Sequence, residues 1–192
     1  NSDLRYATLN GSKISREIVD GNAAKVQSYE EIVRVPTASN VSVSNACAVT
    51  AEGIQVFYRD ESQGILLGAS KAPGAKWNYE LIDGDRKTDN RTTGDVGMKL
   101  RAVAVGSKVS VLYTSIISMN SQKLATNGEV RLATRSGTSP LWSYQTLDAA
   151  AQSVAVAGFD VGLNKTANGV IASWMTATRL TLAHPNQIRW VN

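Results

Sequence analysis

The sequence predicts an all-β protein built from a repeated four-stranded antiparallel unit. Most segments alternate between apolar and polar residues with a period of two and are bounded by Gly, Asn, Asp or Pro, as strands are. No segment shows the spacing of a convincing amphipathic helix. The strand patterns also return along the chain. The shared alanines Ala7, Ala69, Ala133 and Ala183 are 62, 64 and 50 residues apart.

Length and composition limit the function classes. The chain has 192 residues, of which 43% are hydrophobic and 19% charged, so it can form the core of a single domain. It contains no run of 18 apolar residues, and we expect no membrane span. The net charge of +4 comes from basic residues scattered along the chain. Because nucleic-acid-binding proteins concentrate basic residues on one face, no nucleic-acid partner is expected.

Each repeat opens with two strands of different character. The first strand carries two alanines two positions apart, which suits a strand crowded against a central axis. These pairs are Ala46 and Ala48, Ala102 and Ala104, and Ala155 and Ala157. The second strand is apolar on both faces and has an aromatic residue at its fifth position, which suits a strand between two neighbouring sheets. These strands are predicted at 54–60, 109–114 and 170–175.

Two further strands complete each repeat. The third strands are predicted at 4–8, 66–70, 130–134 and 180–184. The fourth strands are predicted at 14–21, 77–84, 142–149 and 188–192. Asp20, Asp83 and Asp148 recur just after the fourth strand, and we interpret them as turn formers that cap backbone N–H groups. Packing between sheets is the default role of the tryptophans, which are Trp77, Trp142, Trp174 and Trp190.

Four antiparallel strands per repeat form the blade of a β-propeller. We expect about three and a half blades in a single propeller or propeller portion over 1–192. Residues 1–20 are a half blade, and 41–84, 98–148 and 153–192 are complete blades. Linkers are expected at 21–40 and 85–97, and a long loop at 115–128. The stretch 22–35 is ambiguous, and Pro36 would end a short helix there.

An incomplete ring would leave a sheet edge with unpaired N–H and C=O groups. We therefore expect the propeller to be completed by another protein chain or by a segment removed through proteolysis or cloning. The lone Cys47 lies among small residues and is interpreted as a buried core thiol, and the lone His184 as a surface or packing residue.

Residues 54–84 contain Ile-x-Val-Phe-Tyr-x-Asp, then Gly-x-Leu, then a tryptophan strand. This pattern resembles the blades of the fungal fucose-binding lectins, which are six-bladed propellers with sugar sites between blades. In that family an arginine on the second strand and a Glu or Gln on the third or fourth strand hold the sugar hydroxyls, with an aromatic ring beneath. At the arginine position this chain has Gln55, Ser110 and Ile171. The resemblance implies ligand-binding residues at Trp77, Tyr79, Glu80, Trp142, Tyr144 and Gln145.

A weaker resemblance is to the Asp-box propellers of the sialidase type, whose Ser-x-Asp-x-Gly-x-Thr-Trp turn joins the third and fourth strands. Residues 70–77 keep the Ser, Gly and Trp but have Ala72 in place of the aspartate. Residues 136–142 are one residue short of the motif. Because this turn is structural even in enzymes, the likeness implies no activity.

Enzyme chemistry has little support in the sequence. A glycosidase needs two facing carboxylates ~5–10 Å apart, and the sequence pairs no two acids in this way. Asp160, on a predicted inner strand, is the acid with the best case for a functional role, on grounds of burial. We assign no catalytic residues, no metal ligands and no cofactor, because neither a phosphate loop nor a His–Glu metal motif is present.

Four N-glycosylation sequons favour an extracellular protein. They begin at Asn10, Asn40, Asn90 and Asn164. The preferred hypothesis is a secreted or cell-surface, non-catalytic propeller that binds a carbohydrate ligand between its blades. The alternatives are a glycoside hydrolase of the propeller type and a protein-interaction or assembly subunit.

Overall fold

The structure is a computed structural model, and its described residues are entirely strand, turn and coil. It describes residues 3–21, 27–29, 32–34, 40–85, 90–93, 95–119, 121, 125–137, 139, 141–149, 155–178 and 187–191. The strands are β1 (Leu4–Asn10), β2 (Lys13–Asp20), β3 (Gln27–Tyr29), β4 (Ile32–Arg34), β5 (Val41–Thr50), β6 (Gly53–Asp60), β7 (Ile65–Lys71), β8 (Asn78–Asp83), β9 (Asp95–Val105), β10 (Lys108–Met119), β11 (Ala125–Ser136), β12 (Ser143–Ala149), β13 (Ala155–Lys165), β14 (Val170–Thr178) and β15 (Gln187–Val191).

The strands pair mostly with their neighbours in the chain. The pairs β1–β2 and β3–β4 form two-stranded sheets, and β5 to β8 form a four-stranded sheet in chain order. The remaining strands form a seven-stranded sheet in the order β15-β14-β13-β11-β10-β9, with β12 also on β11. Within it, β11 and β13 are joined only by the parallel pair Gly128 and Val156. The seven-stranded sheet is therefore an antiparallel sheet β9–β12 attached at one point to an antiparallel sheet β13–β15.

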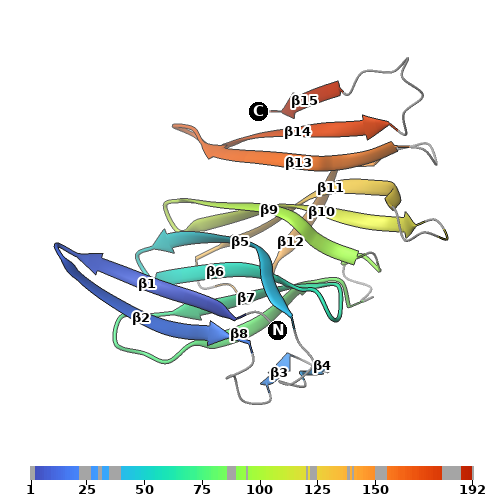
Figure 1. The fold of residues 1–192 in the computed structure, drawn as a ribbon. Coiled ribbons are helices and arrows are strands. Elements are labelled where there is room, and N and C mark those ends of the chain that lie inside the picture. Colours follow the sequence, from blue (N-terminus) through green and yellow to red (C-terminus); the bar gives the residue numbers. More distant parts are fainter. Residues whose placement is uncertain are drawn as a thin grey trace.

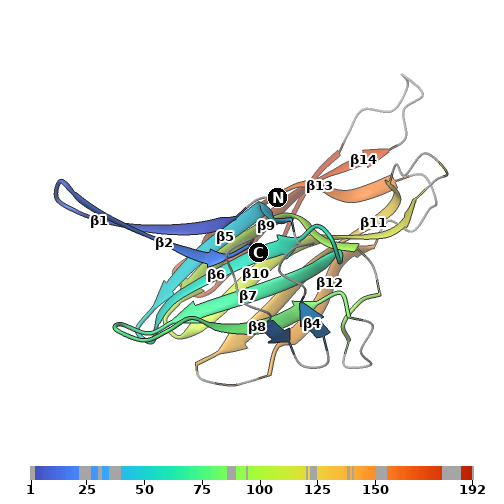
Figure 2. The ribbon, with the colours of Figure 1, turned by 60° about the horizontal axis from the view of Figure 1, so that its bottom comes forward.

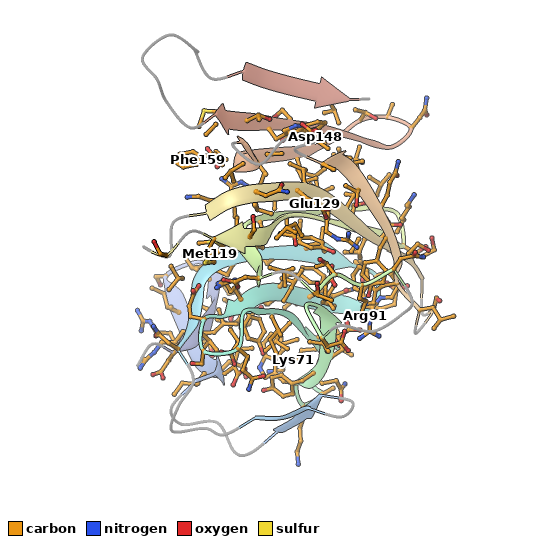
Figure 3. All side chains as sticks on the ribbon, turned by 90° about the vertical axis from the view of Figure 1, so that its right-hand side faces the viewer. Lys71, Arg91, Met119, Glu129, Asp148 and Phe159 are labelled. Carbon is orange, nitrogen blue, oxygen red and sulfur yellow. The ribbon has the colours of Figure 1, made fainter. Side chains whose placement is uncertain are left out.

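The sheets lie in a stack, with the β1–β2 hairpin at one end and β13–β15 at the other (Figure 1). Figure 2 shows the turn of the β1–β2 hairpin projecting beyond the strands beside it. Figure 3 shows side chains filling the spaces between successive sheets. Three buried clusters occupy these spaces, and their largest members include Tyr58, Tyr113 and Trp174. Each of these aromatic residues is the fifth residue of a predicted second strand.

The all-β prediction is confirmed, but the long loop predicted at 115–128 is wrong. β10 continues to Met119 and β11 begins at Ala125, so that only a short connection separates them. Ser115 pairs with Glu129, and Ile116 with Gly128. Ser115 and Ile116 are buried, which explains why the strand extends past the repeat pattern. β9 likewise begins at Asp95, inside the predicted linker 85–97.

Two other stretches differ from the prediction. The ambiguous stretch 22–35 contains the short strands β3 and β4 instead of a helix. The segment 188–192 is expected as a fourth strand, but its described residues 188–191 fall in β15, which pairs directly with β14 and so takes the place of a third strand. The predicted third strand at 180–184, including His184, lies outside the described residues, as does the side chain of Trp190.

Cys47 is exposed, so the predicted buried thiol is wrong. The cause is the two-residue period of β5. Ala46 and Ala48, on either side of Cys47, face the core between β5–β8 and β9–β12, which turns Cys47 to the opposite side. The paired alanines of β5 thus lie on its core side, with Ala48 buried and Ala46 part-buried.

Candidate functional site

An aspartate at the end of a sheet accepts a hydrogen bond from the aromatic residue in the second strand of the next sheet. This contact occurs three times, once in each space between sheets. The distances from the donor atom to Oδ2 are 2.6 Å for Tyr58 and Asp20, 2.5 Å for Tyr113 and Asp83, and 2.8 Å for Trp174 and Asp148. The aspartates therefore join successive sheets, a role that the sequence did not predict.

The other carboxylate oxygen of two of these aspartates caps backbone N–H groups. Asp20 Oδ1 accepts a hydrogen bond of 2.8 Å from Gly21 N. Asp83 Oδ1 accepts one of 2.8 Å from Gly84 N and one of 2.7 Å from Thr92 N. The predicted turn-forming role is thus confirmed for Asp20 and Asp83.

Asp83 lies in a buried polar cluster with Tyr113 and Arg131. Burial raises the pKa of Asp83, although hydrogen bonds from Tyr113 and Thr92 and the charge of Arg131 oppose the rise. Burial and the neighbouring carboxylate raise the pKa of Tyr113 well above its ordinary value. Arg131 Nε donates to Asp83 Oδ2 at 3.2 Å. Because Asp83 and Tyr113 are both fully buried, this cluster holds the sheets together and is closed to ligands.

A glutamate on the last strand of one sheet also holds a cation and a tryptophan of the next sheet. In the first of these clamps, Lys71 Nζ lies 2.7 and 2.8 Å from the two carboxylate oxygens of Glu17. Trp77 Nε1 donates to Glu17 at 3.3 Å. Lys71 Nζ also lies 5.5 Å from the centre of the Trp77 ring, within the range of a cation–π interaction.

The second clamp repeats this arrangement with shorter contacts to the tryptophan. Arg135 Nη1 lies 2.9 and 2.8 Å from the two oxygens of Glu80, and Trp142 Nε1 donates to Glu80 at 3.0 Å. The Arg135 guanidinium lies 4.4 Å from the centre of the Trp142 ring. Arg135 Nη2 additionally donates to Gln55 Oε1 at 2.9 Å. Four contacts therefore fix the orientation of Arg135.

Five of the ligand-binding residues predicted from sequence lie at these contacts between sheets. Trp77, Glu80 and Trp142 belong to the two clamps. The hydroxyls of Tyr79 and Tyr144 donate to the backbone oxygens of Val19 and Ile82, both at 2.6 Å. The packing role expected of the tryptophans is therefore confirmed for Trp77 and Trp142, whose rings contact Tyr6 and Phe57 of the preceding sheets edge to face.

The other two predicted site residues lie apart from the clamps. Gln145 is exposed on β12, at the strand position that Glu17 and Glu80 occupy in the earlier sheets. The side chain of Asp160 is 63% exposed on β13 and lies 4.0 Å from Arg101. The expected burial of Asp160 is wrong, because its neighbour Val161 takes the inward position on this strand.

A polar cleft opens beside the second clamp, where the β5–β8 sheet meets the end of β11. Its volume is about 260 Å³. The lining residues are Glu52, Gly53, Ile54, Gln55, Ser70, Lys71, Ala72, Asn78, Arg135, Gly137 and Ser139. Amide, hydroxyl, ammonium and guanidinium groups thus converge on one small concave surface. Trp142 lies against Arg135 at its edge.

Sequence reasoning missed most residues of this cleft. Lys71 and Arg135 each follow a shared alanine of the repeat by two positions, so a longer alignment of the third strands would have found them. Gln55, Asn78 and Ser139 come from different strands and turns. Nothing in the repeat indicates that these three residues meet, because they occupy different positions within it.

A second hollow, of about 360 Å³, lies at the opposite ends of these strands and is lined by Glu61, Asp95 and mostly small polar residues. Arg59 is buried beside it and pairs with both acids, with Nε 2.8 Å from Glu61 and Nη1 in contact with Asp95. A guanidinium between the two carboxylates leaves them unsuited to acid–base catalysis as a pair.

The asparagines of the four sequons are exposed. Asn10 ends β1, Asn40 precedes β5, Asn90 lies in a turn with φ 69°, and Asn164 is near the end of β13. The threonine of the third sequon, Thr92, is buried. The sequence prediction of glycosylation stays a prediction.

Over its described residues the structure holds no group of three or more His, Cys, Asp or Glu side chains placed to bind a metal ion. The same residues include no helix with the length and apolar character needed to cross a membrane. Comparison of the chain with protein-family models, curated proteins and solved structures finds no match. The function is therefore inferred from the geometry of the site.

Proposed function

We propose that this protein is a non-catalytic carbohydrate-binding protein whose sheets are blades of a β-propeller. The propeller assignment is supported by the contacts that recur between sheets. Three successive sheets each present an aspartate to the next one, and two of them also present a glutamate, at the same strand positions. Blades of a propeller pack face to face through such repeated contacts.

The cleft between the β5–β8 sheet and β11 is the proposed sugar site. The observation that carries this proposal is its lining of amides, hydroxyls and cations in a volume of about 260 Å³. Gln55 and Asn78 can each donate and accept hydrogen bonds, as adjacent sugar hydroxyls do. The volume lies below the ~300–1,000 Å³ typical of drug-sized ligands, which favours a ligand of one or two sugar rings.

Rigidity of the cleft supports binding over catalysis. Glu80, Trp142 and Gln55 hold Arg135 in place, so little side-chain entropy is lost when a ligand binds to the guanidinium. Glu52 is the one carboxylate among the lining residues, whereas glycoside hydrolysis ordinarily uses two. We place the protein outside the cell or on its surface, as the sequons favour.

Glycan-array screening followed by calorimetric titration of the best sugar tests this function. Asn78→Ala should weaken sugar binding about tenfold, the size expected from one lost hydrogen bond in a small site. Gln145→Ala is the matched control, because Gln145 is an exposed amide that does not line the cleft. Absence of binding to every sugar, or equal loss from both variants, would contradict the proposed site.

Aryl glycosides of the sugars that bind should not be hydrolysed. If they are, the glycoside hydrolase alternative replaces the lectin-like function. The variant Glu52→Gln then decides whether the reaction uses this cleft.

A further inference from the structure

Each inner sheet of the stack has two different faces. The receiving face packs against the preceding sheet, and the forward face packs against the following one. In the β5–β8 sheet, Tyr58, Leu67 and Leu81 belong to the receiving face and lie in the cluster shared with β1–β2. Phe57 and Ile82 belong to the forward face and lie in the cluster shared with β9–β12.

The β1–β2 hairpin uses only its forward face within the described structure. Leu4 and Val19 are buried against the β5–β8 sheet. The receiving face of the hairpin is defined by three cross-strand pairs, whose residues are all exposed. The pairs are Arg5 with Ile18, Ala7 with Arg16, and Leu9 with Ile14.

The corresponding pairs in the next sheet are covered. Leu67 pairs with Leu81 and Ala69 with Tyr79 at the positions of Arg5–Ile18 and Ala7–Arg16. Leu67, Ala69 and Leu81 are at most 3% exposed. In the hairpin, Ile18, at the position of Leu81, is 39% exposed, and Leu9 and Ile14, at the positions of the half-buried Lys71 and Trp77, are 73% and 46% exposed. A face that is covered in one repeat is therefore open in another, where it carries Ala7, Ile18 and two arginines.

The open face of the hairpin also carries an arginine at a position that makes a contact between sheets elsewhere in the structure. Arg5 occupies the position that Arg131 has in the β9–β12 sheet. Arg131 Nε binds Asp83 at the end of the preceding sheet, at 3.2 Å. Arg5 thus lies where another sheet of this type would approach, and its Nη2 is 3.3 Å from Oδ2 of Asp3 in the same chain.

The opposite end of the stack carries an open forward face. Ala172 and Trp174 of β14 are buried against the β9–β12 sheet. The alternate residues Ile171, Ser173 and Met175 lie on the other side of β14 and are only half-buried. No sheet in the described part of the chain packs on that side (Figure 1).

We propose that the chain associates with a second copy of itself head to tail, with the receiving face of the β1–β2 hairpin of one copy packed on the forward face of β14 of the other. One open face of each kind, at opposite ends of one stack, is the arrangement that this contact requires. The contact is heterologous, so repeated association closes a ring or extends a filament. It goes beyond carbohydrate binding and does not depend on it.

Sedimentation velocity over a wide dilution series tests the proposal with two variants. Ile18→Asp places a charge on the receiving face, and Ser173→Arg places one on the forward face. Each should weaken self-association by about tenfold or more, because an unpaired charge at an apolar contact is costly. Leu141→Asp is the matched control, since Leu141 is 76% exposed outside both faces and should leave association unchanged.

An equimolar mixture of the two variants gives the decisive result. Each variant keeps the face that the other has lost, so the mixture should form dimers and nothing larger. Circular dichroism verifies that both variants fold, and Met175→Arg replaces Ser173→Arg if the latter does not. A monomeric wild-type protein, association that survives either variant, or a mixture that stays monomeric would overturn the proposal.

Discussion

The phenol oxygen of Tyr113 lies 2.5 Å from Oδ2 of Asp83, and this contact joins the second strand of one sheet to the last strand of the sheet before it. Both residues are 0% exposed. Arg131 shares the same carboxylate oxygen. Because water cannot replace a lost partner in such a place, the contact should be among the more valuable polar interactions of the fold.

Tyr113→Phe should lower the free energy of unfolding by about 1–3 kcal/mol, since the ring still fills its space but the buried carboxylate loses a donor. Urea unfolding followed by tryptophan fluorescence measures the change. Combining Tyr113→Phe with Asp83→Asn completes a double-mutant cycle. A coupling energy near zero would show that the contact contributes nothing.

The ionisation of Asp83 should make the free energy of unfolding depend on pH. Burial raises the pKa of Asp83 in the folded protein above its ordinary value of 3.8, so the folded state binds a proton more readily than the unfolded chain. The contribution of this group to the free energy of unfolding is therefore largest in acid and falls as the pH rises through the window above 3.8.

Asp83→Asn removes this contribution. The free energy of unfolding of the wild type, less that of Asp83→Asn, should decrease as the pH rises above 3.8. Urea unfolding of both proteins at several pH values gives this difference. A difference that grows with pH would mean that Arg131 and the hydrogen-bond donors outweigh burial at this carboxylate.

The two glutamate clamps should differ in strength. The side chains of Arg135 and Glu80 are 12% and 29% exposed, whereas those of Lys71 and Glu17 are 22% and 39% exposed. Glu80→Ala should lower the free energy of unfolding by about 2 kcal/mol, because it leaves a part-buried guanidinium and an indole without their shared acceptor. Glu17→Ala should lower the free energy of unfolding by only about 0.5 kcal/mol, because solvent screens this more exposed pair.

Thermal unfolding of the two clamp variants, side by side, checks this order. Each variant serves as the control for the other, because each removes a glutamate that binds a cation and a tryptophan, in clamps that differ in burial and in the cation. Equal losses would mean that burial does not determine the strength of the clamps.

Gly53 should tolerate no side chain. It has φ 133°, and an added Cβ would collide with the backbone oxygen of Lys71 in the neighbouring strand. Gly53→Ala should therefore destabilise the protein by more than about 2 kcal/mol. Gly11→Ala is the matched control, because Gly11 also has a positive φ, of 58°, but open space around it.

Chemical unfolding of both glycine variants separates a clash from backbone strain alone. Gly11→Ala should cost about 1 kcal/mol, the usual penalty for a left-handed alanine. If the two variants lower the free energy of unfolding equally, the clash with β7 adds nothing to the strain of a positive φ.

Much of the fold could be predicted from sequence because it depends on local alternation and on a repeat. The aromatic residues Tyr58, Tyr113 and Trp174 were identified by their fifth position, and each lies in the core between sheets. The extension of β10 over 115–119 could not be predicted from sequence, because the other repeats have no counterpart to it. Its cause is the burial of Ser115 and Ile116, a tertiary effect.

The candidate site was less accessible to sequence reasoning. Glu80 and Trp142 were each identified as a recurring position, but their contact with each other and with Arg135 was not, and so a contact between sheets was interpreted as a sugar site. The cleft itself combines Gln55 and Asn78 of one sheet with Arg135 of the next. Its composition follows from how two sheets meet, which no single strand encodes.

The single parallel pair between β11 and β13 has a consequence for the shape of the stack. At Gly128 an added Cβ would lie 2.9 Å from Cγ1 of Val156 and 3.3 Å from the backbone oxygen of Ala157. A side chain at this position would push β13 away from β11 and rotate the β13–β15 sheet relative to β9–β12. The position of the β13–β15 sheet relative to β9–β12 therefore depends on the hydrogen atom that glycine carries in place of a side chain.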